Sequence, residues 1–198
     1  RVLDLFDRYG IRSTFFTVGL LFFDRKDMLR AQLPAPLPRY TDETLSPYGA
    51  YLDTVGATED EDPLHFARSL VLHIRDRAMH EIASHTFSHY YCLEDGQGID
   101  EFRADLQAAQ EAARTLGIEL RTIAFPRNQV SAAHVAVCAE EGFVAYRGTE
   151  ESWVYRSRPD REETMLRRVV RLADAYTNLT GHHTYGYAES AASQPYNI

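Results

Sequence analysis

The sequence predicts an α/β protein built on a parallel sheet. Three observations support this: amphipathic helical patterns alternate with short apolar runs, glycine often stands between the two, and polar side chains follow the apolar runs. Helices that alternate with short strands indicate parallel strands, because the chain must cross back over the sheet before the next strand begins. An open doubly wound sheet and a closed barrel both satisfy this pattern.

The repeated unit is a helix followed by a strand. Four units are predicted, at residues 2–9 and 11–18, 63–77 and 80–84, 102–116 and 118–125, and 132–141 and 143–146. Gly10, Gly117 and Gly142 stand between helix and strand in three of the units. Glycine is expected there because a helix often ends in a residue with positive φ.

Residues 24–62 interrupt the repeats. The segment holds four prolines and an acidic run at residues 59–62, which predicts a loop insertion. It is either a solvated excursion or a lid, and in the second case Tyr40, Tyr48 and Tyr51 are candidates for stacking on a sugar.

Length and composition indicate one domain within residues 1–198. The formal net charge of −8 argues against nucleic acid as a partner, and no apolar run is long enough for a membrane span. Two cysteines are too few for a disulfide framework, and we expect a cytoplasmic protein with reduced thiols. The first residues already follow a helical pattern with no N-cap and no Met, so we expect a partial domain, incomplete at its N-terminus.

The carboxyl ends of parallel strands meet at one edge, where function gathers. We therefore expect Gly19, the pair His85 and His89, residues 126–129, and Arg147 to lie near one another. On one helical turn, side chains four residues apart share a face, and two neutral imidazoles there could bind one cation. The competing interpretation is a pair of hydrogen-bonded histidines without a ligand. Thr86 and Ser88 could hold the loop through backbone hydrogen bonds.

Four segments resemble the polysaccharide deacetylases, the NodB-homology family: residues 7–19, 81–89, 123–129 and 146–153. The resemblance covers about residues 1–153. It implies a deformed (β/α) barrel with parallel strands, incomplete here at the N-terminus. It also implies a divalent metal, most often zinc, held by His85, His89 and an aspartate. That aspartate and the catalytic base would precede residue 1, so the chain by itself is expected to be inactive.

The activity implied by the resemblance is metal-dependent hydrolysis of N- or O-acetyl groups on a polysaccharide or its precursor. Arg127 matches the arginine-bearing catalytic motif, although Pro126 precedes it here and the family places arginine first. We expect substrate contacts from four further residues: Asn128, Gln129, Arg147 and Trp153. Glu150 or Glu151 would replace the usual aspartate of the fourth motif, and His182 and His183 are candidates for the catalytic acid.

Two alternatives stay open at this point. One is another C–N amide hydrolase on the same scaffold, and the other is a catalytically inactive carbohydrate-binding relative. A zincin protease is excluded by spacing, because Ser84 stands where the second histidine of H-E-x-x-H would follow His80 and Glu81.

Overall fold

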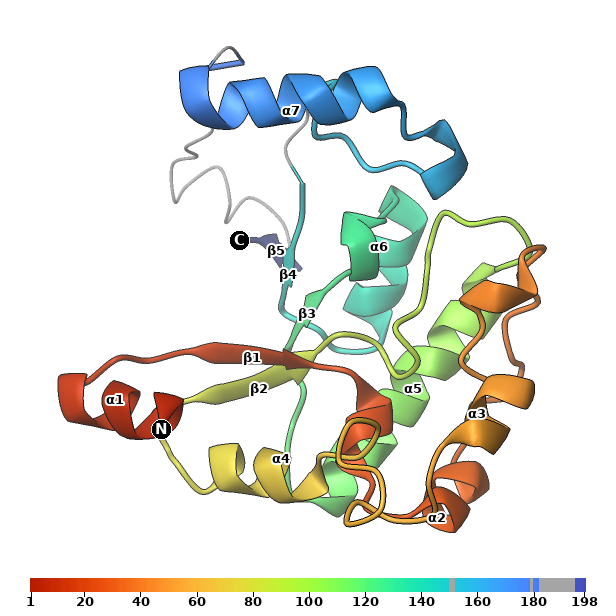
Figure 1. The fold of residues 1–198 in the computed structure, drawn as a ribbon, viewed down its shortest axis with the longest axis vertical. Helices are drawn as coiled ribbons and strands as arrows, with labels where there is room; N and C mark the ends of the chain where they lie inside the picture. Colours follow the sequence, from red (N-terminus) through yellow and green to blue (C-terminus); the bar gives the residue numbers. More distant parts are fainter. Residues whose placement is uncertain (150–151, 179, 182–194) are drawn as a thin grey trace.

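Five parallel strands form one sheet in the computed structural model, which describes residues 1–149, 152–178, 180–181 and 195–198 (Figure 1). The strands are β1 (Thr14–Thr17), β2 (Glu81–Ser84), β3 (Thr122–Ala124), β4 (Ala145–Arg147) and β5 (Tyr196–Asn197). Each strand pairs with its predecessor in the chain. A doubly wound sheet reverses its strand order at a switch point, whereas a (β/α) barrel adds strands in one direction. The predicted α/β class is confirmed, and the sequential order is that of a (β/α) barrel.

The helix α1 (Val2–Tyr9) precedes β1, and α4 (Arg68–Arg75), α5 (Ile99–Thr115) and α6 (Ala132–Glu140) each lead into the next strand. Gly10, Gly117 and Gly142 follow three of them with φ of 65°, 69° and 85°. These glycines therefore end helices in the left-handed conformation, as predicted. The core beneath the sheet is rich in phenylalanine, with Phe66, Phe87 and Phe102 almost completely buried.

The strands are shorter than their apolar runs. The expected strand at 11–18 is paired over Thr14–Thr17, and the one at 118–125 over Thr122–Ala124. Apolar periodicity marks residues that will be buried, but a strand extends only where a neighbour supplies backbone partners. The helix expected at 63–77 is likewise shorter and begins at Arg68.

The insertion at 24–62 carries two short helices, α2 (Lys26–Ala31) and α3 (Ala50–Thr54). Tyr40 and Tyr48 are buried, so the prediction that they form a sugar platform is wrong, while Tyr51 is exposed. The Tyr40 hydroxyl accepts a hydrogen bond from the Tyr91 backbone N–H at 2.9 Å. The insertion therefore braces the segment that follows the two histidines.

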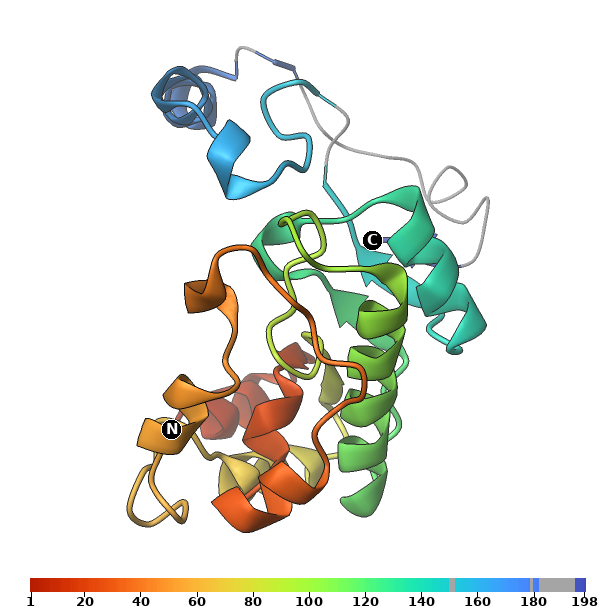
Figure 2. The same ribbon diagram turned by 90° about the vertical axis from the view of Figure 1, so that its right-hand side faces the viewer.

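The helix α7 (Met165–Thr177) was not predicted. Figures 1 and 2 place it beyond the carboxyl end of β4, on the side away from α1 and α4. The buried Arg167 guanidinium ties it down by donating to the carbonyl oxygens of Trp153 and Val154, at 2.7 and 2.9 Å. Within the described ranges, no helix has both the length and the apolar character needed to cross a bilayer.

Candidate active site

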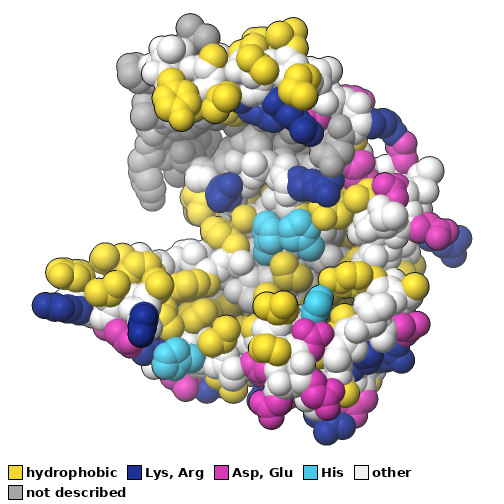
Figure 3. Space-filling view, viewed as in Figure 1, with side chains coloured by type: hydrophobic (Ala, Val, Ile, Leu, Met, Phe, Trp, Pro, Cys, Tyr) yellow, Lys and Arg dark blue, Asp and Glu magenta, His cyan; other side chains and the backbone are white. Residues whose placement is uncertain are grey.

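His85 and His89 lie side by side directly after β2. The centroids of the two imidazole rings are 4.9 Å apart, with an angle of 68° between the ring planes. The backbone between them is a loop, because Thr86 and His89 have φ of 64° and 60°, which a right-handed helix does not allow. The sequence spacing was thus informative, but the helical turn assumed for it is wrong. In Figure 3, a group of histidine side chains lies in a hollow of the surface, with basic side chains between it and α7.

The protonation of His85 is set by its neighbour. Its Nδ1 lies 2.8 Å from the Ala124 carbonyl oxygen, which can only accept a hydrogen bond. Nδ1 therefore carries the proton, and Nε2 keeps its lone pair for a ligand. Burial, together with the Arg147 charge, lowers the pKa of His85, while burial and the charges of His85 and Arg127 lower the pKa of His89 to about 4. Both rings are neutral at pH 7, the form that binds metals.

The loop between the histidines is anchored by a buried carboxylate from α5. Asp105 accepts hydrogen bonds from the backbone N–H of Phe87 at 2.6 Å and of Ser88 at 3.2 Å, and also from the Ser88 hydroxyl. Its side chain is fully buried, which raises its pKa to about 7 against the opposing effect of these three donors. Asp105 therefore fixes the residues midway between the two rings.

Asp105 was not among the predicted site residues. A signal was present, because Asp105 lies on the apolar stripe of α5, three residues after the buried Phe102 and four before the buried Ala109. A charged residue at a core-facing position of a helix requires hydrogen-bonding partners. The sequence shows this requirement but does not say which loop supplies the donors.

Hydroxyl groups complete the support of the loop. The Ser84 hydroxyl accepts from the Thr86 N–H at 3.0 Å, and the Thr86 hydroxyl accepts from the Tyr90 N–H at 2.7 Å. The predicted backbone hydrogen bonding of Thr86 is thus confirmed, whereas the Ser88 hydroxyl bonds the Asp105 carboxylate and not the backbone. On the other side, the Gly19 N–H donates to the Thr86 carbonyl, and a Cβ at Gly19 would lie 2.7 Å from Cδ2 of Phe87. Only glycine allows this approach.

Arg127 lies against the same group of rings. Its guanidinium carbon is 4.3 Å from the centroid of the Tyr91 ring, and the Tyr91 ring centroid is 5.2 Å from that of His89. A guanidinium over an aromatic face is a favourable cation–π contact. Arg127 and His89 therefore flank one tyrosine, which keeps the cation close to the histidine pair.

Backbone strain concentrates at these two loops. Five non-glycine residues of the described chain have positive φ, and four of them are Thr86, His89, Arg127 and Asn128. A β-branched residue such as Thr86 is rare in this conformation, which costs about 1–2 kcal/mol per residue. Strain of this kind gathers where surrounding contacts hold side chains in a functional arrangement.

Asn128 and Arg147 join the site from β3 and β4. With His85, Arg127 and Phe16 they line a pocket of about 280 Å³. A guanidinium nitrogen of Arg147 lies 3.4 Å from the Asn128 side-chain oxygen. The structure thus brings Arg127, Asn128 and Arg147 to the histidines, as the strand-end argument predicts.

The chain's family follows from its sequence. A sequence model of polysaccharide deacetylases matches residues 1–146. The chain belongs to the polysaccharide deacetylase family. No curated protein sequence matches it.

Several solved structures are similar to this polysaccharide deacetylase domain. A family 4 carbohydrate esterase from Streptomyces lividans in complex with acetate is 13% identical with a TM-score of 0.45, over 75% of this chain and 54% of that chain. A de-N-acetylase from Aggregatibacter actinomycetemcomitans is 12% identical with a TM-score of 0.47, over 85% and 68%. A CE4 family pseudoenzyme from Bacillus anthracis is 14% identical with a TM-score of 0.46, over 75% and 37%. The chain thus spans about half of the esterase and just over a third of the pseudoenzyme.

The arginine motif of this chain departs from the family order, with Pro126 before Arg127. The three residues form the 3-10 turn η3 (Pro126–Asn128), in which Arg127 and Asn128 have φ of 52° and 55°. The left-handed pair turns the chain sharply after β3. Arg127 lies in this turn and contacts the Tyr91 ring, although proline and arginine stand in the reverse of the family order.

Two of the predicted substrate-contact residues, Gln129 and Trp153, do not line the histidine pocket. Gln129 is buried, and its amide accepts from the Leu93 N–H at 3.0 Å and donates to the Glu94 carboxylate at 2.6 Å. Trp153 is exposed and lines neither the histidine pocket nor the pocket beside it. The burial of Gln129 and the exposure of Trp153 depend on packing that the sequence pattern does not encode. Glu150, Glu151, His182 and His183 lie outside the described residues.

His85 and His89 supply some of the ligands that a divalent metal needs. Two neutral imidazoles close together, one with its Nε2 available, match the nitrogen ligands that zinc prefers. Among the described residues, no group of three His, Cys, Asp or Glu side chains lies close enough to hold a metal ion. His85 and His89 therefore fit as two of the ligands, with further donors to be supplied from outside the described set.

Proposed function

We propose that the chain supplies the metal-binding and arginine-bearing part of a deacetylase that removes N- or O-acetyl groups from a polysaccharide or its precursor. The observation that carries the proposal is the pair His85 and His89, held side by side by a strained loop that Asp105 anchors. Membership of the polysaccharide deacetylase family supports the same reaction class.

The histidines would hold a divalent cation, most often zinc, through one ring nitrogen each. A bound cation of this kind polarises a carbonyl group and lowers the pKa of coordinated water. The protein's contribution is the fixed geometry: the Ala124 carbonyl orients the His85 ring, and Asp105 holds the loop between the two rings. Such outer partners of ligating histidines set both orientation and affinity.

Arg127, Asn128 and Arg147 would handle the substrate. Arg127 carries a permanent charge and a planar set of donors, and its stacking on Tyr91 keeps that plane in one orientation. Arg127 would orient a carboxylate or the acetyl oxygen beside the histidines. Asn128 and Arg147 offer an amide and a second guanidinium on the wall of the same pocket, suited to sugar hydroxyls.

Metal binding tests the proposal most directly. We expect His85→Ala and His89→Ala each to lower the zinc bound per protein molecule after dialysis, measured by atomic absorption. His73→Ala is the matched control, because His73 is an exposed residue of α4 away from the site. Unchanged zinc content in both site variants would overturn the assignment.

Acetate release from acetylated oligosaccharides tests the reaction itself. Release that depends on both histidines is the expected result for zinc-loaded protein that also contains the aspartate base and ligand implied by the family resemblance, whereas residues 1–198 alone should release none. If zinc and glycan bind without acetate release, the inactive carbohydrate-binding interpretation replaces the enzyme. Cleavage of a different amide without release of acetate would favour another C–N hydrolase.

A further inference from the structure

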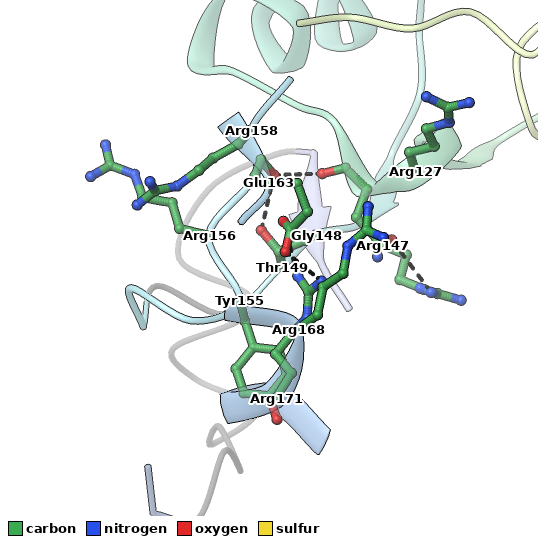
Figure 4. A pocket seen from close by; sticks show the side chains of 12 residues that line it. Arg127, Arg147, Gly148, Thr149, Tyr155, Arg156, Arg158, Glu163, Arg168 and Arg171 are labelled. Atoms are coloured by element: carbon green, nitrogen blue, oxygen red, sulfur yellow. Dashed lines mark hydrogen bonds and ion pairs between the residues drawn. The ribbon is translucent and has the colours of Figure 1, made fainter. Parts of the chain in front are cut away.

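A second pocket opens beyond the carboxyl ends of β3 and β4 and measures about 650 Å³ (Figure 4). Six arginines line it: Arg127, Arg147, Arg156, Arg158, Arg168 and Arg171. Glu163 is its one acidic lining residue among those described. This concentration of positive charge occurs in a chain whose formal net charge is −8.

The arginines that line the pocket come from several elements. Arg147 ends β4, whereas Arg168 and Arg171 extend from α7 toward Gly148 in Figure 4. Arg156 and Arg158 belong to the segment that leads to α7. The arginine-rich stretch 156–171 supplies four of the six arginines, and tertiary packing brings it to Arg127 and Arg147 against the mutual repulsion of the guanidinium groups.

Internal carboxylates balance only part of this charge. Glu163 lies 2.8 Å from Arg171 and 3.3 Å from the buried Arg167. In the part of the chain that the structure describes, the side chains of Arg158 and Arg168 form no ion pair. Guanidinium groups stay charged at any physiological pH, so an anion entering the pocket would relieve the repulsion.

The basic pocket adjoins the histidine pocket. Arg127, Asn128 and Arg147 line both cavities. A ligand that reaches His85 from this side therefore passes directly along the arginines. An extended molecule such as a glycan could occupy both cavities at once.

We propose that the arginine-lined pocket binds an anionic group of the glycan whose acetyl group reaches His85 and His89, so that the substrate is an acidic polysaccharide. This inference rests on the proposed deacetylase function. The planar forks of arginine match the paired oxygens of carboxylate, sulfate and phosphate groups. The negative charge of the rest of the protein disfavours nucleic acid, which would place many phosphates against the whole surface.

Binding of oligosaccharides without acetyl groups, measured by calorimetry on metal-free protein, tests the pocket separately from the chemistry. We expect uronate, sulfated or phosphorylated oligosaccharides to bind at least tenfold more tightly than a neutral oligosaccharide of equal length, a preference that roughly one or two charge-assisted hydrogen bonds can supply. Their affinity should fall as the salt concentration rises. Comparing the three anions identifies the group preferred. Equal affinity for the neutral chain, or tighter binding of a DNA oligonucleotide, would overturn the proposal.

The double variant Arg158→Gln/Arg168→Gln is expected to lose about tenfold or more in affinity for the preferred anionic oligosaccharide. The control Arg8→Gln/Arg114→Gln removes the same charge from α1 and α5, far from the pocket, and should keep wild-type affinity. If both double variants lost affinity equally, the effect would come from net charge alone, and the proposed anion site in the pocket would be refuted. The binding measurement involves neither a metal nor an acetyl group. Anion binding without any deacetylation would therefore refute only the proposed reaction and leave the anion site standing.

Discussion

Asp105 is the residue on which the histidine loop depends most, and its substitution gives the sharpest test of the site. In Asp105→Asn the side-chain oxygen can still accept one backbone N–H, from Phe87 or from Ser88, but the new NH₂ group faces the other. One buried N–H is then left without an acceptor, which costs about 1–3 kcal/mol. Asp105→Ala leaves both N–H groups unsatisfied and adds a void, which costs about 3–5 kcal/mol.

Urea unfolding followed by circular dichroism near pH 8 measures these losses. Burial raises the pKa of Asp105 to about 7, so the carboxylate is ionised there. Glu111→Gln is the control, since Glu111 is an exposed residue of the same helix whose ion pair with Arg114 is worth little. It should change the free energy of unfolding by less than about 0.5 kcal/mol.

Zinc affinity gives a second readout for the same variants. Loss of the anchor frees the loop between His85 and His89, and we expect Asp105→Asn to bind zinc about tenfold more weakly. The reasoning would be refuted if this variant unfolded like the wild type and bound zinc equally well. A loss of stability with unchanged zinc affinity would make Asp105 a core residue without a role at the site.

Two further predictions concern Arg127 and His134. Arg127→Lys keeps the charge but loses the planar fork and its stacking on Tyr91. In protein that also contains the aspartate base, acetate release should therefore fall at least about tenfold with little change in melting temperature, and an unchanged rate would place Arg127 outside the reaction. Burial lowers the pKa of His134 to about 4, so the stability that its neutral form contributes is complete above about pH 6.5 and lost as the pH falls toward 4. Urea unfolding should show that the wild type loses on the order of 2 kcal/mol more than His134→Gln between pH 7.5 and pH 5, and equal losses would contradict a buried neutral ring.

Local features of the sequence determined the class of fold and the centre of the site. Gly10, Gly117 and Gly142 mark helix ends because the left-handed conformation they adopt is a property of the residue itself. His85 and His89 could be predicted from their place after an apolar run, since the chain direction puts that place at the carboxyl edge of a parallel sheet. The family motifs are local in the same sense.

Tertiary structure alone decided how the site is held and what lies beside it. Asp105 meets the histidine loop at a sequence separation of seventeen to eighteen residues, and Arg168 reaches the β4 edge from a helix that was not predicted. Gln129, which follows the same strand as Arg127, turns inward to bond Glu94. Sequence periodicity shows which residues must be buried or charged, but the partner of each is chosen by the packing of segments far apart in the chain, because hydrogen bonds and ion pairs act only over a few ångströms.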